Sequence, residues 1–174
     1  MSNASFQPEI GEDGQPDLAA AHRWLGAHLN NGAWKLIDDE SISPEAPLRD
    51  REEALYRAYA SAYHWMQVGN PMNQGRGEHL ISRTAVLVGS KDLARRHAER
   101  YLELIDANPE LAEDWDRGFA HEAMARALAM AGDVDRARAE RREAERLCAL
   151  IVEDEEREIV EAELAREPWF GLNS

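Results

Sequence analysis

Residues 70–83, NPMNQGRGEHLISR, bring together residue types that often bind charged ligands or a metal. Arg76, His79 and Arg83 recur at the i, i+3, i+7 spacing, so they share one face of a helix. Arginine pairs with carboxylates through a planar fork, and histidine is both a proton acceptor and a metal ligand. The stretch therefore predicts either a binding surface or a set of ordinary ion pairs.

Several local motifs of enzymes and metal sites are missing from the sequence, which leaves open only sites assembled from separate helices. No histidine lies four residues from another, and no Glu-x-x-His or His-Glu-x-x-His motif occurs. Gly75-Arg76-Gly77 follows a helical segment and lacks the lysine of a phosphate-binding loop. No serine stands in a G-x-S-x-G turn. We therefore expect no catalytic residue, no metal and no cofactor.

The composition limits the partners that the chain can bind. With 174 residues, of which 44% are hydrophobic and 31% charged, it is typical of one globular domain. A net charge of −14 disfavours nucleic acid and anionic membranes, and no apolar run approaches the ~20 residues of a membrane span. A single cysteine, Cys148, and an N-terminus unlike a signal peptide predict a cytoplasmic protein, and the alanine and arginine content is typical of a GC-rich bacterial genome.

Hydrophobic periodicity and capping residues predict an all-α fold of seven helices. Residues 1–16 are expected to form a flexible N-terminal segment, and 17–174 a single domain. The expected helices cover about residues 17–30, 48–68, 70–88, 91–107, 112–131, 133–152 and 154–166. Asn30-Asn31-Gly32 is expected to end the first helix. The last helix is acidic and caps the domain, with Ile159 turned inward, and the tail through Trp169 and Phe170 docks on the last helices.

Two segments of the chain repeat with an offset of 43 residues, which relates Gly89 to Gly132. In each segment a helix, a glycine turn and a second helix follow in one register. The degenerate repeats cover about residues 70–111 and 112–153. A period of this kind is typical of helical solenoids, in which hairpins stack to bury their apolar faces.

Residues 129–140, AMAGDVDRARAE, resemble the central turn of a tetratricopeptide repeat through Gly132, Asp133 and Ala137. The family's repeat of about 34 residues is shorter than the offset here. The large aromatic of its second helix is also absent, because Ala98 and Arg141 occupy those positions. The segments WMQVG and RGEHLISR are similar to those of small bacterial members of that superfamily. The resemblance implies a right-handed α-α superhelix of about seven antiparallel helices.

The resemblance also implies that the first helix of each hairpin lines a concave surface. The 43-residue offset then makes the two helical stripes neighbours, and the candidate binding residues are Arg76, His79, Arg83, Trp115, Phe119, Glu122 and Arg126. Such a groove suits a protein or peptide segment with a carboxylate. The alternative is that these arginines pair with Glu78, Asp116 and Glu122 on a solvated face.

The predicted function is a non-catalytic protein- or peptide-binding scaffold. One alternative is a small-molecule-binding protein or an enzyme, with a pocket between hairpins lined by histidine, arginine and glutamate and using His64, His79 or His121. Another is a homodimer joined through Trp169 and Phe170. The sequence leaves open whether the groove is free or occupied by the ends of the chain itself.

Overall fold

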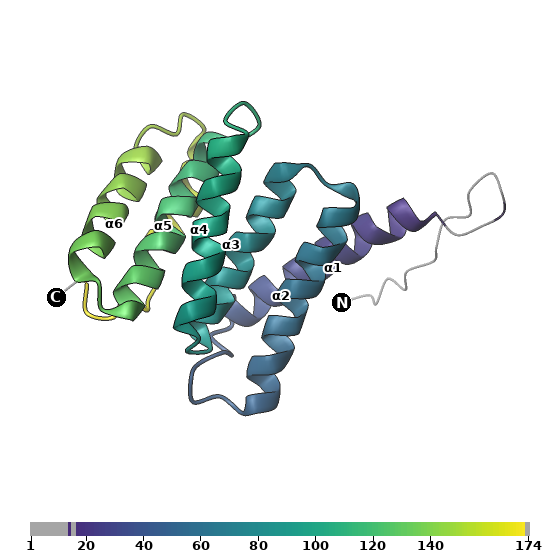
Figure 1. Cartoon of the computed structure of the whole chain (residues 1–174), viewed down its shortest axis with the longest axis horizontal. Helices are drawn as coiled ribbons and strands as arrows, with labels where there is room; N and C mark the ends of the chain where they lie inside the picture. The colour runs from purple at the N-terminus through teal and green to yellow at the C-terminus, as the bar shows by residue number, and fades with distance from the viewer. Residues whose placement is uncertain (1–13, 15–16, 173–174) are drawn as a thin grey trace.

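The computed structural model describes Gly14 and residues 17–172, so most of the predicted N-terminal segment 1–16 lies outside the described residues. The described residues form seven α-helices and no strand (Figure 1). The helices are α1 (Leu18–Asp38), α2 (Leu48–Val68), α3 (Pro71–Leu87), α4 (Lys91–Ala107), α5 (Asp114–Ala131), α6 (Val134–Cys148) and α7 (Asp154–Ala165). The prediction of an all-α superhelix of about seven helices is confirmed.

The first six helices form three hairpins that stack in chain order. α1 pairs with α2, α3 with α4, and α5 with α6, and Figure 1 shows α3 to α6 side by side. Successive hairpins touch through α2 and α3 and through α4 and α5. The helices α1, α3 and α5 also contact one another in sequence, while α7 packs against α5 and α6. The side of the superhelix formed by α1, α3 and α5 is called the inner face below.

The turns of the second and third hairpins have the same geometry. Gly89 and Gly132 adopt left-handed φ angles of 83° and 84°, which glycine reaches without steric cost. The amides of the following residues, Ser90 and Asp133, donate to the carbonyl five residues earlier at 2.8 and 3.0 Å. The offset of 43 residues therefore relates positions that are equivalent in the structure.

The first hairpin uses the same turn without a glycine, which corrects the predicted end of the first helix. α1 continues through residues 30–32 to Asp38, and Glu40 takes the left-handed position with φ 51°. The amide of Ser41 donates to the carbonyl five residues earlier at 3.0 Å, as in the other turns. Gly32 instead lies inside the helix, where a Cβ would come within 2.8 Å of Nη1 of Arg57. Gly32 thus lies close to a flexible side chain of α2 and does not mark a helix end.

The other helix boundaries agree with prediction within a few residues. α5 begins at Asp114, two residues later than expected, and α6 ends at Cys148, four residues earlier. Asn70 caps α3 as predicted, with its side-chain oxygen accepting the amides of Met72 and Asn73, and Pro71 opens the helix. These signals are local, which is why the sequence alone can provide them.

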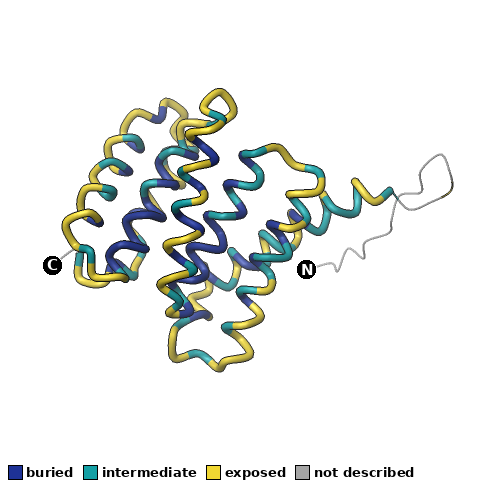
Figure 2. The backbone as a smooth tube through the Cα atoms, in the orientation of Figure 1, coloured by how far each residue is buried: buried dark blue, intermediate teal, exposed yellow. Residues whose placement is uncertain are grey.

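The core is densest around α5, which packs against α3, α4, α6 and α7. Nearly every residue of α5 from Gly118 to Ala129 is buried, and Figure 2 shows α5 and the adjoining part of α3 largely in dark blue. Small residues allow the close packing: a Cβ on Gly75 of α3 would lie 2.7 Å from the ring of Tyr101. Its equivalent, Gly118, leaves room for Val160 of α7.

Candidate functional site

The side chains that the offset of 43 residues relates meet across α3 and α5. Nε2 of His79 lies 3.3 Å from Oε2 of Glu122, its equivalent position. Arg83 and Arg126 are also equivalent, and both approach Oε1 of Glu163 on α7, at 2.5 and 3.9 Å. The two guanidinium groups are therefore neighbours on the inner face.

The end of α7 and the segment after it cover part of this face. We call residues 163–172 the C-terminal strap. Arg126 donates to three backbone carbonyls of the strap at 2.5 to 2.9 Å, and Arg83 donates to the carbonyl of Glu167 at 3.0 Å. With the ion pair between Arg83 and Glu163, these bonds fix the strap to both α3 and α5. The groove is thus occupied here by the chain itself.

Trp169 anchors the strap in the core. Its side chain is fully buried, with its ring 4.1 Å from the guanidinium carbons of Arg126 and Arg141 and its Nε1 donating to the carbonyl of Leu164 at 3.1 Å. The predicted docking of the tail is therefore seen. Trp169 cannot serve the predicted homodimer contact in this state, whereas Phe170 remains 45% exposed.

Arg83, Glu122 and Arg126 are consequently buried and lie on neither an open groove nor a solvated face. Each is at most 2% exposed. Burial alone raises the pKa of Glu122. The effects of Arg126, His79 and Arg83 outweigh burial and lower the pKa to about 2. Burial and the charge of Arg126 also lower the pKa of Arg83. The charge of Glu163 partly offsets this decrease. The prediction did not foresee this burial, because it depends on where the strap lies.

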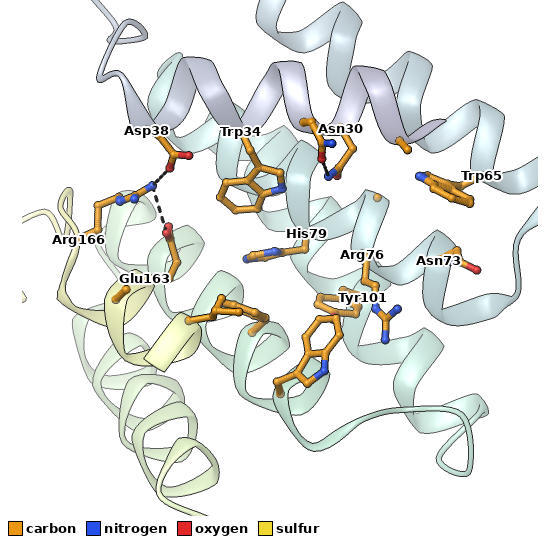
Figure 3. A pocket seen from close by; sticks show the side chains of 17 residues that line it. Asn30, Trp34, Asp38, Trp65, Asn73, Arg76, His79, Tyr101, Glu163 and Arg166 are labelled. Atoms are coloured by element: carbon orange, nitrogen blue, oxygen red, sulfur yellow. Dashed lines mark hydrogen bonds and ion pairs between the residues drawn. The ribbon is translucent and has the colours of Figure 1, made fainter. Parts of the chain in front are cut away.

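Beside the strap the inner face encloses a cavity of about 540 Å³ (Figure 3). Side chains from six helices line it. The lining residues are Ala27, Asn30, Asn31, Trp34, Asp38, Trp65, Asn73, Arg76, Gly77, His79, Tyr101, Trp115, Phe119, Ile159, Ala162, Glu163 and Arg166. We call this cavity the aromatic pocket, because five of these side chains are Trp, Tyr or Phe.

Four of the five aromatic rings of the pocket are joined by ring contacts, directly or through His79. His79 lies at their centre, with ring-centroid distances of 5.6 Å to Trp34, 4.8 Å to Phe119 and 5.9 Å to Tyr101. Trp115 meets Phe119 edge-on at 5.9 Å. Figure 3 shows Trp34 projecting from α1 toward His79 on α3. Such tilted and edge-on contacts hold aromatic rings in fixed orientations, so the wall is preformed.

Arg76 is the basic group at one end of the pocket. Its Nε and Nη2 donate to the two carboxylate oxygens of buried Asp116 at 3.0 and 2.9 Å, and its guanidinium stacks on Trp115 at 4.1 Å. Burial lowers the pKa of Arg76, but Asp116 outweighs it and raises the pKa overall. The hydroxyl of Tyr101 also donates to Asp116, at 2.7 Å, and burial with that carboxylate raises the pKa of Tyr101 well above its usual value. Both donors therefore keep their protons at neutral pH.

At the other end, α7 forms one wall of the pocket mouth. Nη1 of Arg166 lies 2.9 Å from Asp38 on α1 and 3.4 Å from Glu163, which links the two ends of the inner face (Figure 3). Ile159 and Ala162 form the exposed rim. The prediction that Ile159 points inward is wrong, since it is 61% exposed.

The predicted site residues are thus divided between two environments. Those that line the pocket are Arg76, His79, Trp115 and Phe119; those under the strap are Arg83, Glu122 and Arg126. The prediction missed the pocket residues that come from other helices, namely Trp34, Trp65 and Tyr101. A continued apolar periodicity past Gly32 is the one signal that could have placed Trp34 on the inner face.

The histidines of the predicted enzyme alternative do not come together. His64 contacts His22 through their Nδ1 atoms at 2.7 Å, and His121 pairs with Glu140 at 2.7 Å, so only His79 of the three lines the pocket. Within residues 17–172, no group of three or more His, Cys, Asp or Glu side chains is placed to hold a metal ion.

Comparisons of the chain with protein-family models, curated proteins and solved structures gave no match. None of the helices in the described part of the chain is both long and apolar enough to cross a membrane. The aromatic pocket is therefore the feature from which a function can be inferred.

Proposed function

We propose that the protein is a non-catalytic binding protein that holds a small, flat, largely apolar ligand in the aromatic pocket. The main support for the proposal is the set of aromatic side chains that line a cavity of about 540 Å³. Small-molecule sites are typically concave, apolar and about 300–1,000 Å³ in volume, with a few polar groups that orient the ligand. A flat ligand fits best, because stacking on rings of fixed orientation needs little rearrangement.

The lining argues for binding rather than catalysis. Among the described residues that line the pocket there is no serine, threonine, cysteine or lysine, so the aliphatic hydroxyl, thiol and amine nucleophiles are missing. The two acidic groups, Asp38 and Glu163, are both paired with Arg166. His79 faces Glu122, which is itself bound to Arg126. These pairings favour a fixed binding wall over a set of groups that exchange protons with a substrate.

The proposal is tested by closing the pocket from its rim. Ala162 on α7 is exposed and lines the mouth, so Ala162→Phe fills the cavity without removing a core contact. Ala165 is exposed on the same helix outside the pocket, and Ala165→Phe is the matched control. We expect bicyclic aromatic compounds to raise the melting temperature of the parent chain and of Ala165→Phe, but not of Ala162→Phe. An equal response of the two variants would contradict the proposal.

Peptide binding is a second candidate function, which one observation favours. Arg83 and Arg126 hold backbone carbonyls of the chain's own strap, so this part of the inner face suits an extended segment. A partner peptide would have to displace the strap. Membership of the tetratricopeptide-like superfamily, a partner segment with a carboxylate and a bacterial cytoplasmic location stay predictions.

A synthetic peptide of residues 163–172 tests this second candidate. Added to the full-length chain carrying Trp169→Ala, which loosens its own strap, the peptide should bind and restore the melting temperature. A peptide with the tryptophan replaced by alanine is the control. No difference between the two peptides would argue that the inner face holds its strap only as a fixed part of the fold.

A further inference from the structure

We propose that the ligand of the aromatic pocket carries a carboxylate, which the outer edge of the Arg76 guanidinium binds. This inference rests on the proposed function and names the chemical class of the ligand. It follows from the donors that the pocket leaves unused, from the pairing of its acidic groups, and from the position of Arg76 on Trp115.

The guanidinium of Arg76 has two edges that can each hold a carboxylate through two parallel hydrogen bonds. Asp116 occupies the Nε and Nη2 edge at 3.0 and 2.9 Å. The Nη1 and Nη2 edge has no hydrogen-bond partner within residues 17–172, and the side chain is 36% exposed at the pocket. The second edge is thus available to a ligand without breaking the first pair.

The unused polar groups of the pocket are mostly donors. The indole N–H groups of Trp34, Trp65 and Trp115 have no acceptor among the residues that the structure describes, and each ring lines the cavity. An indole N–H can only donate, as can a guanidinium N–H. A ligand that carries acceptor oxygens therefore satisfies more of this wall than one that carries donors.

A cationic ligand is the competing possibility, because aromatic walls also bind ammonium groups. In this pocket, however, one face of Trp115 already carries the guanidinium of Arg76. Of the two acids, Glu163 is shared between Arg83 and Arg166, and Asp38 is paired with Arg166. The carboxylates thus have cations already, and the geometry favours an anion.

The carboxylates nearest to Arg76 oppose an anion, so their own partners matter. Asp116 accepts from the hydroxyl of Tyr101 at 2.7 Å and from the amide of Glu113 at 3.1 Å as well as from Arg76. Three groups therefore donate hydrogen bonds to Asp116, and they reduce the repulsion between its charge and an anion. The Glu113 side chain, on an exposed residue, is the other acid near Arg76, and solvent screens it.

The position of Arg76 over Trp115 places a bound carboxylate beside an aromatic ring. A carboxylate bound bidentately lies in the guanidinium plane, which is stacked on the indole at 4.1 Å. The aromatic rings that line the same cavity, among them Phe119 beside His79, form its apolar part. An aromatic carboxylate thus matches both the polar and the apolar parts of the pocket.

Three probes of the same shape separate the possible ligand charges: naphthalene-2-carboxylate, naphthalene-2-carboxamide and (naphthalen-2-yl)methylammonium. Their affinities for the full-length chain are measured by quenching of tryptophan fluorescence. Because hydrogen bonds between charged groups are stronger than neutral ones, we expect the carboxylate to bind at least about tenfold tighter than the carboxamide. We expect the ammonium probe to bind weakest.

The role of Arg76 is tested with two variants that keep the site near Asp116 electrically balanced. Arg76→Lys keeps the positive charge but has no planar edge, and Arg76→Gln with Asp116→Asn removes both charges. Both should reduce the preference for the carboxylate about tenfold and leave the carboxamide affinity unchanged. Arg95→Lys is the control, because Arg95 forms an exposed pair with Glu99 outside the pocket.

The outcomes separate this inference from the proposed function. Equal affinities for carboxylate and carboxamide, tightest binding of the ammonium probe, or a preference that survives both Arg76 variants would overturn the carboxylate assignment while the pocket remains a binding site. Failure of all three probes to bind at millimolar concentration would overturn the proposed function as well.

Discussion

The two halves of the inner face are built from equivalent side chains of α3 and α5 but differ in what covers them. In one half, Arg83 and Arg126 are at most 2% exposed and hold the C-terminal strap. In the other, Arg76 keeps a free edge toward the aromatic pocket. The same residue type is thus structural in one place and available in the other.

Helix position alone therefore does not decide the role of an arginine. The repeat places the three arginines on one surface, and the strap then decides which of them meet solvent. A covered arginine with several carbonyl partners is part of the fold, because removing it leaves buried acceptors unpaired. Variants on the two halves should therefore differ in kind, with stability affected in one and ligand affinity in the other.

The largest effect is expected for Arg126→Ala in the covered half. This change leaves Glu122 buried without its main cation and removes the hydrogen bonds of Arg126 to three strap carbonyls. We expect a loss of about 4 kcal/mol in the free energy of unfolding, measured by urea denaturation. Arg95→Ala, which removes only an exposed ion pair with Glu99, should leave it nearly unchanged. Similar losses for both variants would contradict a structural role of Arg126.

Truncation of Trp169, which anchors the strap, should reduce the free energy of unfolding nearly as much as Arg126→Ala. Trp169→Ala empties a fully buried site and removes the contacts of its ring with Arg126 and Arg141, so we expect a loss of about 3 kcal/mol in the free energy of unfolding. The neighbouring Phe170 is 45% exposed, and Phe170→Ala should cost less than about 1 kcal/mol. The reverse order would mean that the strap is anchored at another point.

Acid should weaken the covered half selectively. The pKa of Glu122 is about 2 in the folded chain, against 4.5 for an unperturbed glutamate, so folding favours its deprotonated form. The stability that it contributes is therefore complete above about pH 4.5 and is lost as the pH falls toward 2. Glu122→Gln removes this contribution, and its denaturation midpoint should fall less steeply with acid than that of the parent chain. Parallel curves would show that Glu122 is not held ionised by the fold.

The smallest effect is expected at the mouth of the pocket. Asp38→Asn breaks the exposed contact with Arg166, and we expect it to change the free energy of unfolding by less than about 0.5 kcal/mol, as measured by urea denaturation. A loss of stability comparable to that of Trp169→Ala would contradict this expectation and show that the contact between Asp38 and Arg166 is important for the fold.

The elements of the fold with local signals could be predicted from the sequence. Asn70-Pro71 starts α3, and Gly89 and Gly132 end the first helices of two hairpins, since glycine reaches positive φ without cost. Glu40 adopts the same left-handed conformation at the end of α1. Glutamate rarely does so, and the prediction therefore misplaced the end of α1. A signal that depends on residue type is missing where a residue other than glycine adopts this conformation.

The site could be predicted only in part, for a similar reason. The repeat relates α3 to α5 and therefore located His79 beside Glu122. No repeat relates α1 to these helices in the sequence, so Trp34 was not expected in the pocket. The amphipathic pattern of the last helix showed that one side is buried, but not that Glu163 would reach Arg83. Long-range contacts of this kind have no local pattern.

The division of the inner face is tested most directly by the indole N–H signals of the five tryptophans in a nuclear magnetic resonance titration with naphthalene-2-carboxylate. Trp34, Trp65 and Trp115 line the pocket, whereas Trp169 of the strap is buried in the core with its N–H bound to a backbone carbonyl. We predict that the three pocket signals shift and that the Trp169 signal stays in place. A shift of Trp169 with the pocket signals unchanged would contradict the division.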